Sequence, residues 1–89
     1  MINYLVEFIG TFIFLSVILT SGEAIPIGVA LAAVILFGGK ISGGNFNPAV
    51  SLSMLLSNKL GTMDTMAYIA AQVAGAAAAV IFVKNASKH

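Results

Sequence analysis

The chain has 89 residues, of which 60% are hydrophobic and only 8% are charged, whereas soluble domains carry about 25% charged residues. A soluble chain of this size could not bury so many apolar side chains, so the composition excludes a soluble domain and predicts a multi-pass integral membrane protein. The absence of cysteine excludes disulfides and thiolate metal sites, and a net charge of +1 argues against a nucleic-acid partner. The length allows about three spans of ~20 residues, and we expect the host bilayer to be the cell membrane.

The first predicted span covers residues 4–20, which at 1.5 Å per residue reach about 25 Å. A secretory signal is the alternative reading, but the stretch lacks a basic start and a small-residue cleavage pattern, and Glu7 interrupts it. An acidic residue inside a membrane is costly, so Glu7 is expected either to have a partner or to reach headgroup water.

The second predicted span covers residues 24–37 and has Pro26 in its first turn, where proline is tolerated. We expect this helix to end at Phe37, because Gly38-Gly39-Lys40 follows directly.

Residues 38–57 are predicted to form a re-entrant loop and a half-length helix. Gly43 and Gly44 allow the backbone to turn sharply. Asn47 is a favourable N-cap, and Pro48 suits the first helical position. The helix expected over residues 48–57 is about 15 Å long, half the thickness of a bilayer, so the chain returns to the side it left.

The third predicted span covers residues 63–83, with Thr62 or Asp64 as its cap, and a polar, frayed tail is expected over residues 84–89, including a solvated His89. The span is rich in small residues, which fall in two rows at a spacing of four: Ala67, Ala71 and Gly75, and Ala70, Ala74 and Ala78. Such rows allow close helix approach in lipid, although alanine is also simply a good helix former. The predicted fold is an all-α membrane protein with three transmembrane helices and one re-entrant half-helix.

A half-helix inside a membrane requires that its non-helical entry is buried in protein or lines a watery cavity. Its N-terminus carries unpaired N–H groups and the positive end of the helix dipole, which offer donors to neutral polar molecules and repel cations. The Asn47 amide adds donors, and apolar walls could come from Ile27, Val29, Ile41 or Val50. These features indicate a pore for water or small uncharged solutes. We expect no enzyme activity, cofactor or metal site, because the sequence contains neither a nucleophile–base pair nor a cluster of metal ligands.

Residues 41–51 closely resemble the loop of the aquaporin and aquaglyceroporin (major intrinsic protein) family that carries its Asn-Pro-Ala signature, here Asn47-Pro48-Ala49. Residues 7–12, 28–32 and 67–76 resemble the first, second and third helices of that family. The tripeptide alone would be a weak signal, but four matches in the right order are a strong one.

The resemblance covers only the first half of the family, whose members contain two such halves related by an inverted repeat. It therefore implies that residues 1–89 form a single half-aquaporin repeat. By position, Ile27, Gly44 and Val50 correspond to selectivity-filter residues, and Val50 stands where the second half of family members has an arginine. A filter of these residues would be apolar and carry no fixed charge.

The resemblance also implies roles for two residues near the loop. Glu7 would accept hydrogen bonds from backbone N–H groups of the loop and hold the entry to the half-helix in shape. Asn45 would also support the loop, and it stands where the family usually has histidine.

A half pore requires a second half, and the simplest source is an inverted second copy. The family topology places Lys40 and Lys59 on one side of the membrane and Lys84 and Lys88 on the other, so lysines give no orientation bias. We therefore hypothesise a passive channel for water or small uncharged solutes such as glycerol, formed by an antiparallel homodimer that can assemble further. The alternatives are a non-conducting interaction subunit or truncated fragment that associates with full-length channels, and a holin-like protein that perturbs lipid.

Overall fold

The computed structural model describes residues 1–87, and this part of the chain contains four α-helices. Helices α1 (Ile2–Ser21), α2 (Ala24–Ser42) and α4 (Thr62–Ala86) are each long and apolar enough to cross a membrane. Helix α3 (Pro48–Leu56) has only 9 residues. The predicted fold class, three transmembrane helices and one shorter helix, is confirmed.

The predicted end of the second span is wrong, because α2 continues past Phe37 to Ser42. Gly38 does not break the helix but allows close packing, since a Cβ at this position would lie 2.6 Å from Cγ1 of Val6. The helix ends instead at Gly43, which has a φ of 92° and donates its N–H to the carbonyl of Gly39 at 2.8 Å.

The third span is also longer than expected at its far end. Helix α4 continues to Ala86, so the predicted fraying from Lys84 onward is wrong for residues 84–86, whereas Lys88 and His89 lie outside the described residues. Gly61 is the N-cap of α4, so neither Thr62 nor Asp64 caps the N-terminus of this helix. Asp64 instead accepts a hydrogen bond from the Tyr4 hydroxyl, which ties the beginning of α1 to the beginning of α4.

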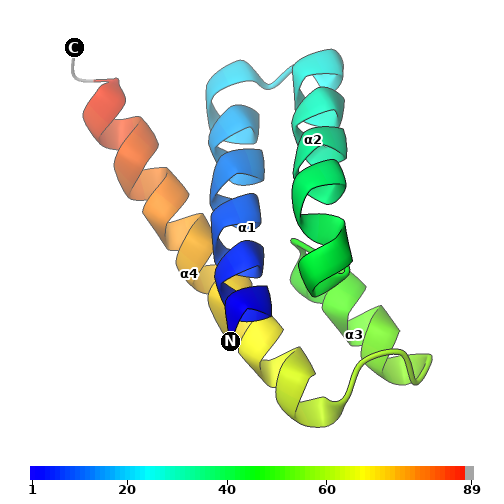
Figure 1. Ribbon diagram of the computed structural model, residues 1–89. Coiled ribbons are helices and arrows are strands. Elements are labelled where there is room, and N and C mark those ends of the chain that lie inside the picture. Colours follow the sequence, from blue (N-terminus) through cyan, green and yellow to red (C-terminus); the bar gives the residue numbers. More distant parts are fainter. Residues whose placement is uncertain (88–89) are drawn as a thin grey trace.

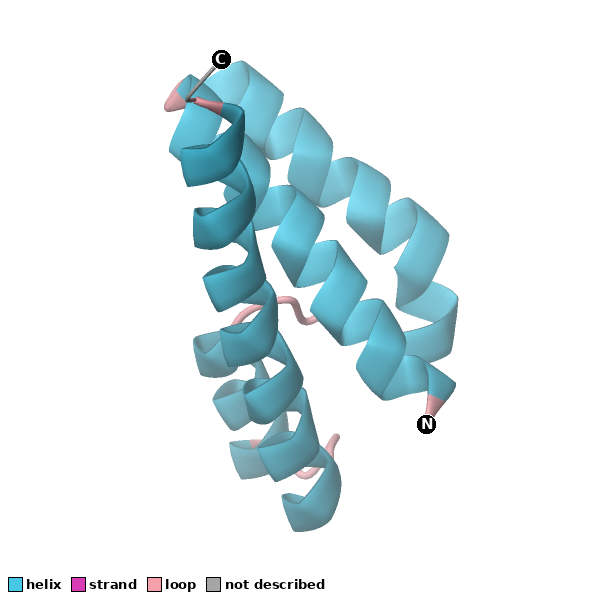
Figure 2. Ribbon diagram, turned by 90° about the vertical axis from the view of Figure 1, so that its left-hand side faces the viewer, coloured by secondary structure: helices cyan, strands magenta, loops and turns pink. Residues whose placement is uncertain are grey.

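Helix α1 is the centre of the arrangement, with α2 and α4 packed against it and α3 packed against α4 (Figure 1). The turn between α1 and α2 and the C-terminal end of α4 lie at one end of the molecule, while the N-terminus and the turn between α3 and α4 lie toward the other. The molecule measures 44 × 23 × 20 Å. Figure 2 shows the loop before α3 close to the middle of the long dimension.

The face of α4 that packs against its neighbours is marked by residues spaced alternately three and four apart: Thr65, Tyr68, Gln72, Gly75 and Ala79. This spacing is typical of helices that cross at a shallow angle. A Cβ on Gly75 would lie 2.7 Å from the carbonyl oxygen of Phe8, so the two backbones approach closely here. The row of small residues that contains Gly75 contacts α1 through Gly75. In the other row, Ala70 and Ala74 are exposed.

Candidate functional site: the loop before the half-helix

The loop between α2 and α3 turns through three residues with positive φ: Gly43 at 92°, Gly44 at 69° and Phe46 at 54°. Glycine adopts such values without steric cost, but a bulky residue does so only when its surroundings hold it there. The conformation of Phe46 therefore requires an explanation from the packing.

The ring of Phe46 is held in a notch between α1 and α2. The side chain is only 2% exposed. A Cβ on Gly10 would overlap the ring, and a Cβ on Gly38 would lie 3.4 Å from its Cζ atom. The two helical glycines thus make the space that the ring fills.

Glu7 of α1 lies directly beneath this loop and is fully buried, which excludes the alternative in which its side chain reaches headgroup water. Its Oε2 accepts hydrogen bonds from the Ser42 hydroxyl at 2.7 Å and from the Asn45 N–H at 3.1 Å. Its Oε1 accepts from the Phe46 N–H at 2.7 Å and from Nε2 of Gln72 at 2.8 Å. These four neutral donors offset the large cost of burying a carboxylate.

A second group of contacts joins the loop to α3 and α4. Nδ2 of Asn45 donates to Oγ of Ser51 at 2.9 Å, and Nε2 of Gln72 donates to the same atom at 2.8 Å. Ser51 and Gln72 are not among the site residues predicted from the sequence. The one signal for Gln72 was that it is an amide side chain within a long apolar span. This signal is weak, because the neighbouring residues do not show which residue the amide faces.

A third contact closes the base of the loop. The Tyr68 hydroxyl of α4 donates to the carbonyl of Ser42 at 2.6 Å and accepts from Nδ2 of Asn3 at 3.4 Å. The end of α2 is therefore tied to both α1 and α4, although within residues 1–87 the length of α2 packs on α1 alone.

Helix α3 begins as predicted, with Asn47 as its N-cap and Pro48 in its first turn. Oδ1 of Asn47 accepts from the Ala49 N–H at 2.8 Å, which satisfies one of the free donors at this helix end. Asn47, Pro48 and Ala49 are exposed, and Val50 is half-buried. The positive end of the α3 dipole thus lies on a face that the rest of the described chain leaves uncovered.

The Major intrinsic protein family model matches residues 20–89. The chain belongs to the major intrinsic protein family. Membership agrees with the resemblance seen in the sequence and makes the chain an integral membrane protein.

Among known major intrinsic proteins, the chain is 42% identical over 93 residues to glycerol uptake facilitator protein-like 6 of Lactiplantibacillus plantarum, an alignment that covers 93% of this chain and 43% of that protein. It is 41% identical over 69 residues to aquaporin Z of Brucella melitensis, covering 75% and 30% of the two chains. It is 46% identical over 56 residues to aquaglyceroporin AqpS of Rhizobium meliloti, covering 63% and 24%. The chain spans less than half the length of these relatives. No solved structure matches it.

The predicted filter residues of this major intrinsic protein do not lie together within one chain. Ile27 is half-buried in the first turn of α2, and Gly44 follows the other end of that helix, so about 22 Å of helix separates their neighbourhoods. A Cβ on Gly44 would lie 3.5 Å from Cγ1 of Ile35, while Val50 lies in the first turn of α3. The predicted loop-support residues Glu7 and Asn45, in contrast, meet directly, because the Asn45 N–H donates to Oε2 of Glu7.

Proposed function

We propose that residues 1–89 are one half-aquaporin repeat and that two antiparallel copies enclose a passive pore for water and small uncharged solutes such as glycerol. The observation that carries the proposal is the half-helix α3, whose N-terminus with Asn47, Pro48 and Ala49 is exposed near the middle of the molecule's long dimension (Figure 2). Membership of the major intrinsic protein family and the names of its relatives, a glycerol uptake facilitator and aquaporins, support the choice of solute.

In this pore, solutes pass in single file. The Asn47 amide of each copy offers hydrogen-bond donors, and the two opposed α3 N-termini repel cations and protons. Glu7 and Asn45 serve as supports that keep the loop in its turned conformation, through the contacts described above.

An inverted second copy would also complete the filter. Because Ile27 and Gly44 lie toward opposite ends of α2, an inverted second copy would bring its Gly44 and Val50 into the half of the pore that contains Ile27 of the first copy. This filter has apolar walls and no fixed charge, which suits neutral solutes.

The direct test is flux through liposomes that contain only this purified chain. We expect faster water and glycerol entry than in protein-free liposomes, while the liposomes stay tight to ions. Absence of flux would contradict the pore and favour a subunit that needs a full-length channel. Indiscriminate leak would contradict it in favour of lipid perturbation.

Asn47→Asp is the sharpest variant, because an aspartate oxygen can still cap the Ala49 N–H while the amide donors are lost and a negative charge is added. We expect cation leak to rise. The comparison variant Asn47→Ala removes cap and donors without adding charge. Unchanged water flux and ion leak in both variants would remove Asn47 from the mechanism.

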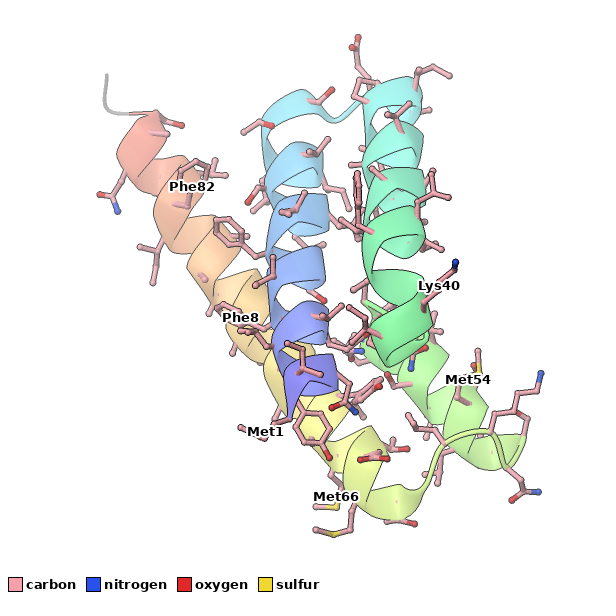
Figure 3. The ribbon with its side chains drawn as sticks, in the orientation of Figure 1. Met1, Phe8, Lys40, Met54, Met66 and Phe82 are labelled. Carbon is pink, nitrogen blue, oxygen red and sulfur yellow. The ribbon has the colours of Figure 1, made fainter. Side chains whose placement is uncertain are left out.

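The antiparallel arrangement has its own test. Lys40 is exposed, and its side chain points away from α1 on the outer side of α2 (Figure 3), so no contact within the described chain neutralises it. Lys40 and Lys59 are expected on one side of the membrane and Lys84 and Lys88 on the other, so the lysines do not favour either orientation. A compartment-specific reporter fused to the C-terminus should give signal from both sides of the membrane. Signal from one side alone would rule out the symmetric dimer.

A further inference from the structure

The side chains of Ser51 in α3 and Gln72 in α4 meet at the contact between these two helices. Both residues are almost completely buried, at 0% and 1% exposed. Nε2 of Gln72 donates to Oε1 of Glu7 and to Oγ of Ser51, at 2.8 Å in each case. An amide nitrogen has two hydrogens, so both are used. Gln72 therefore links α1, α3 and α4 through a single atom.

Helix α3 depends on such a link for its position. A helix of 9 residues is not stable alone. It packs on α4, but neither α1 nor α2 packs along it. Ser51 is its one buried residue, so the hydroxyl of Ser51 is the point at which α3 is anchored most deeply.

Ser51 also lies one turn from the pore-facing end of α3, because its N–H donates to the carbonyl of Asn47 at 3.0 Å. Any shift of Ser51 relative to α4 is passed directly to Asn47. The field at a helix N-terminus falls off within the first turn, so a small displacement would weaken a barrier to cations more than it would slow a neutral solute.

We propose that Gln72 and Ser51 are positioning residues that set the depth and direction of the α3 N-terminus, and thereby the exclusion of ions by the pore. The part that concerns ions rests on the proposed function. The part that concerns the position of α3 does not, and it can be measured separately.

The flux experiment compares Ser51→Ala and Gln72→Met with Ser53→Ala in liposomes. Ser53→Ala is a matched control, because Ser53 lies on the same helix but is exposed, and its hydroxyl donates to the carbonyl of Val50 in its own turn. We expect the ratio of ion leak to water flux to rise roughly three- to tenfold in the first two variants, a range that corresponds to the loss of about one hydrogen bond. The control should match the wild type. A ratio unchanged in both test variants, even with lower thermal stability, would reduce the two residues to a structural role and overturn the proposal.

The position of α3 is measured by the distance between spin labels on Leu52→Cys and Ile81→Cys, both at exposed positions. The chain contains no cysteine, so these labels have no background. We expect Gln72→Met to shift or broaden the distance distribution relative to the labelled protein with Gln72. An unchanged distribution would overturn the inference even if the wild type conducts. A changed distribution in a protein without flux would uphold the positioning and refute the pore.

Discussion

The ring of Phe46 occupies the space that a Cβ on Gly10 would need. The same residue has a φ of 54° and donates its N–H to Glu7 at 2.7 Å. Its backbone and its ring are thus both held by α1, at positions 7 and 10, one turn of helix apart. Because the unfavourable conformation of Phe46 is held from two directions, the direction of the chain into α3 is determined by α1.

Gly10→Ala should destabilise the protein by about 1–3 kcal/mol, because the new methyl group overlaps the Phe46 ring and the ring must move. The measurement is reversible unfolding in mixed detergent micelles. Gly28→Ala is the control, since nothing lies within 4 Å of a Cβ at Gly28. Phe46→Leu should restore part of the loss in the double variant. Equal stability of the two alanine variants would show that the notch does not exist.

Glu7→Gln should lower stability by about 1–3 kcal/mol for each buried donor that loses its acceptor. The Asn45 and Phe46 N–H groups bond to different oxygens of Glu7, and a glutamine amide has only one oxygen. In either orientation of the amide, its NH2 group would therefore face one of these two N–H donors. Unfolding in micelles measures the loss, and Glu23→Gln in the exposed turn is the charge-matched control. A variant as stable as the wild type would mean that the loop does not need the carboxylate.

Gly75→Ala should separate α1 from α4, because the added Cβ would lie 2.7 Å from the carbonyl oxygen of Phe8, and a backbone atom cannot turn aside as a side chain can. We expect the free energy of unfolding to fall by about 1–3 kcal/mol or more, and the yield of folded protein to be lower. Ala74→Val adds volume to an exposed neighbour on the same helix and should be nearly neutral. If the exposed substitution costs as much as the buried one, the assigned interface is wrong.

Tyr68→Phe should lower the free energy of unfolding by about 0.5–1.5 kcal/mol, the usual value of a hydrogen bond. The substitution removes the hydroxyl that donates to the Ser42 carbonyl. Thermal unfolding in detergent checks the loss. Ser57→Ala is the comparison, since the Ser57 hydroxyl is exposed and bonds only to its own turn, to Ser53 and Met54. A Tyr68→Phe variant no less stable than this control would contradict the contact.

Features that depend on neighbours in the chain were predictable. The apolar length of the spans follows from composition, and the start of α3 follows from Asn47 and Pro48, because the cap joins residues two apart. The resemblance to the major intrinsic proteins pointed to Glu7 and Asn45 near the loop. It did not show that the Asn45 side chain would donate to Ser51 of α3.

Features that depend on packing were not predictable. Gly38 and Gly39 are equally consistent with a helix end and with a close approach of two helices, and only the position of Val6 decides between them. In the same way, 65 residues separate Gln72 from Glu7, and nothing along the chain selects that pair. Entry into a membrane, the number of possible spans and the start of the short helix all follow from the order of residues, because hydropathy and capping act between near neighbours. How that helix is held depends on packing, because the hydrogen bonds that hold its loop and Ser51 come from Glu7 of α1 and Gln72 of α4, which lie far away along the chain.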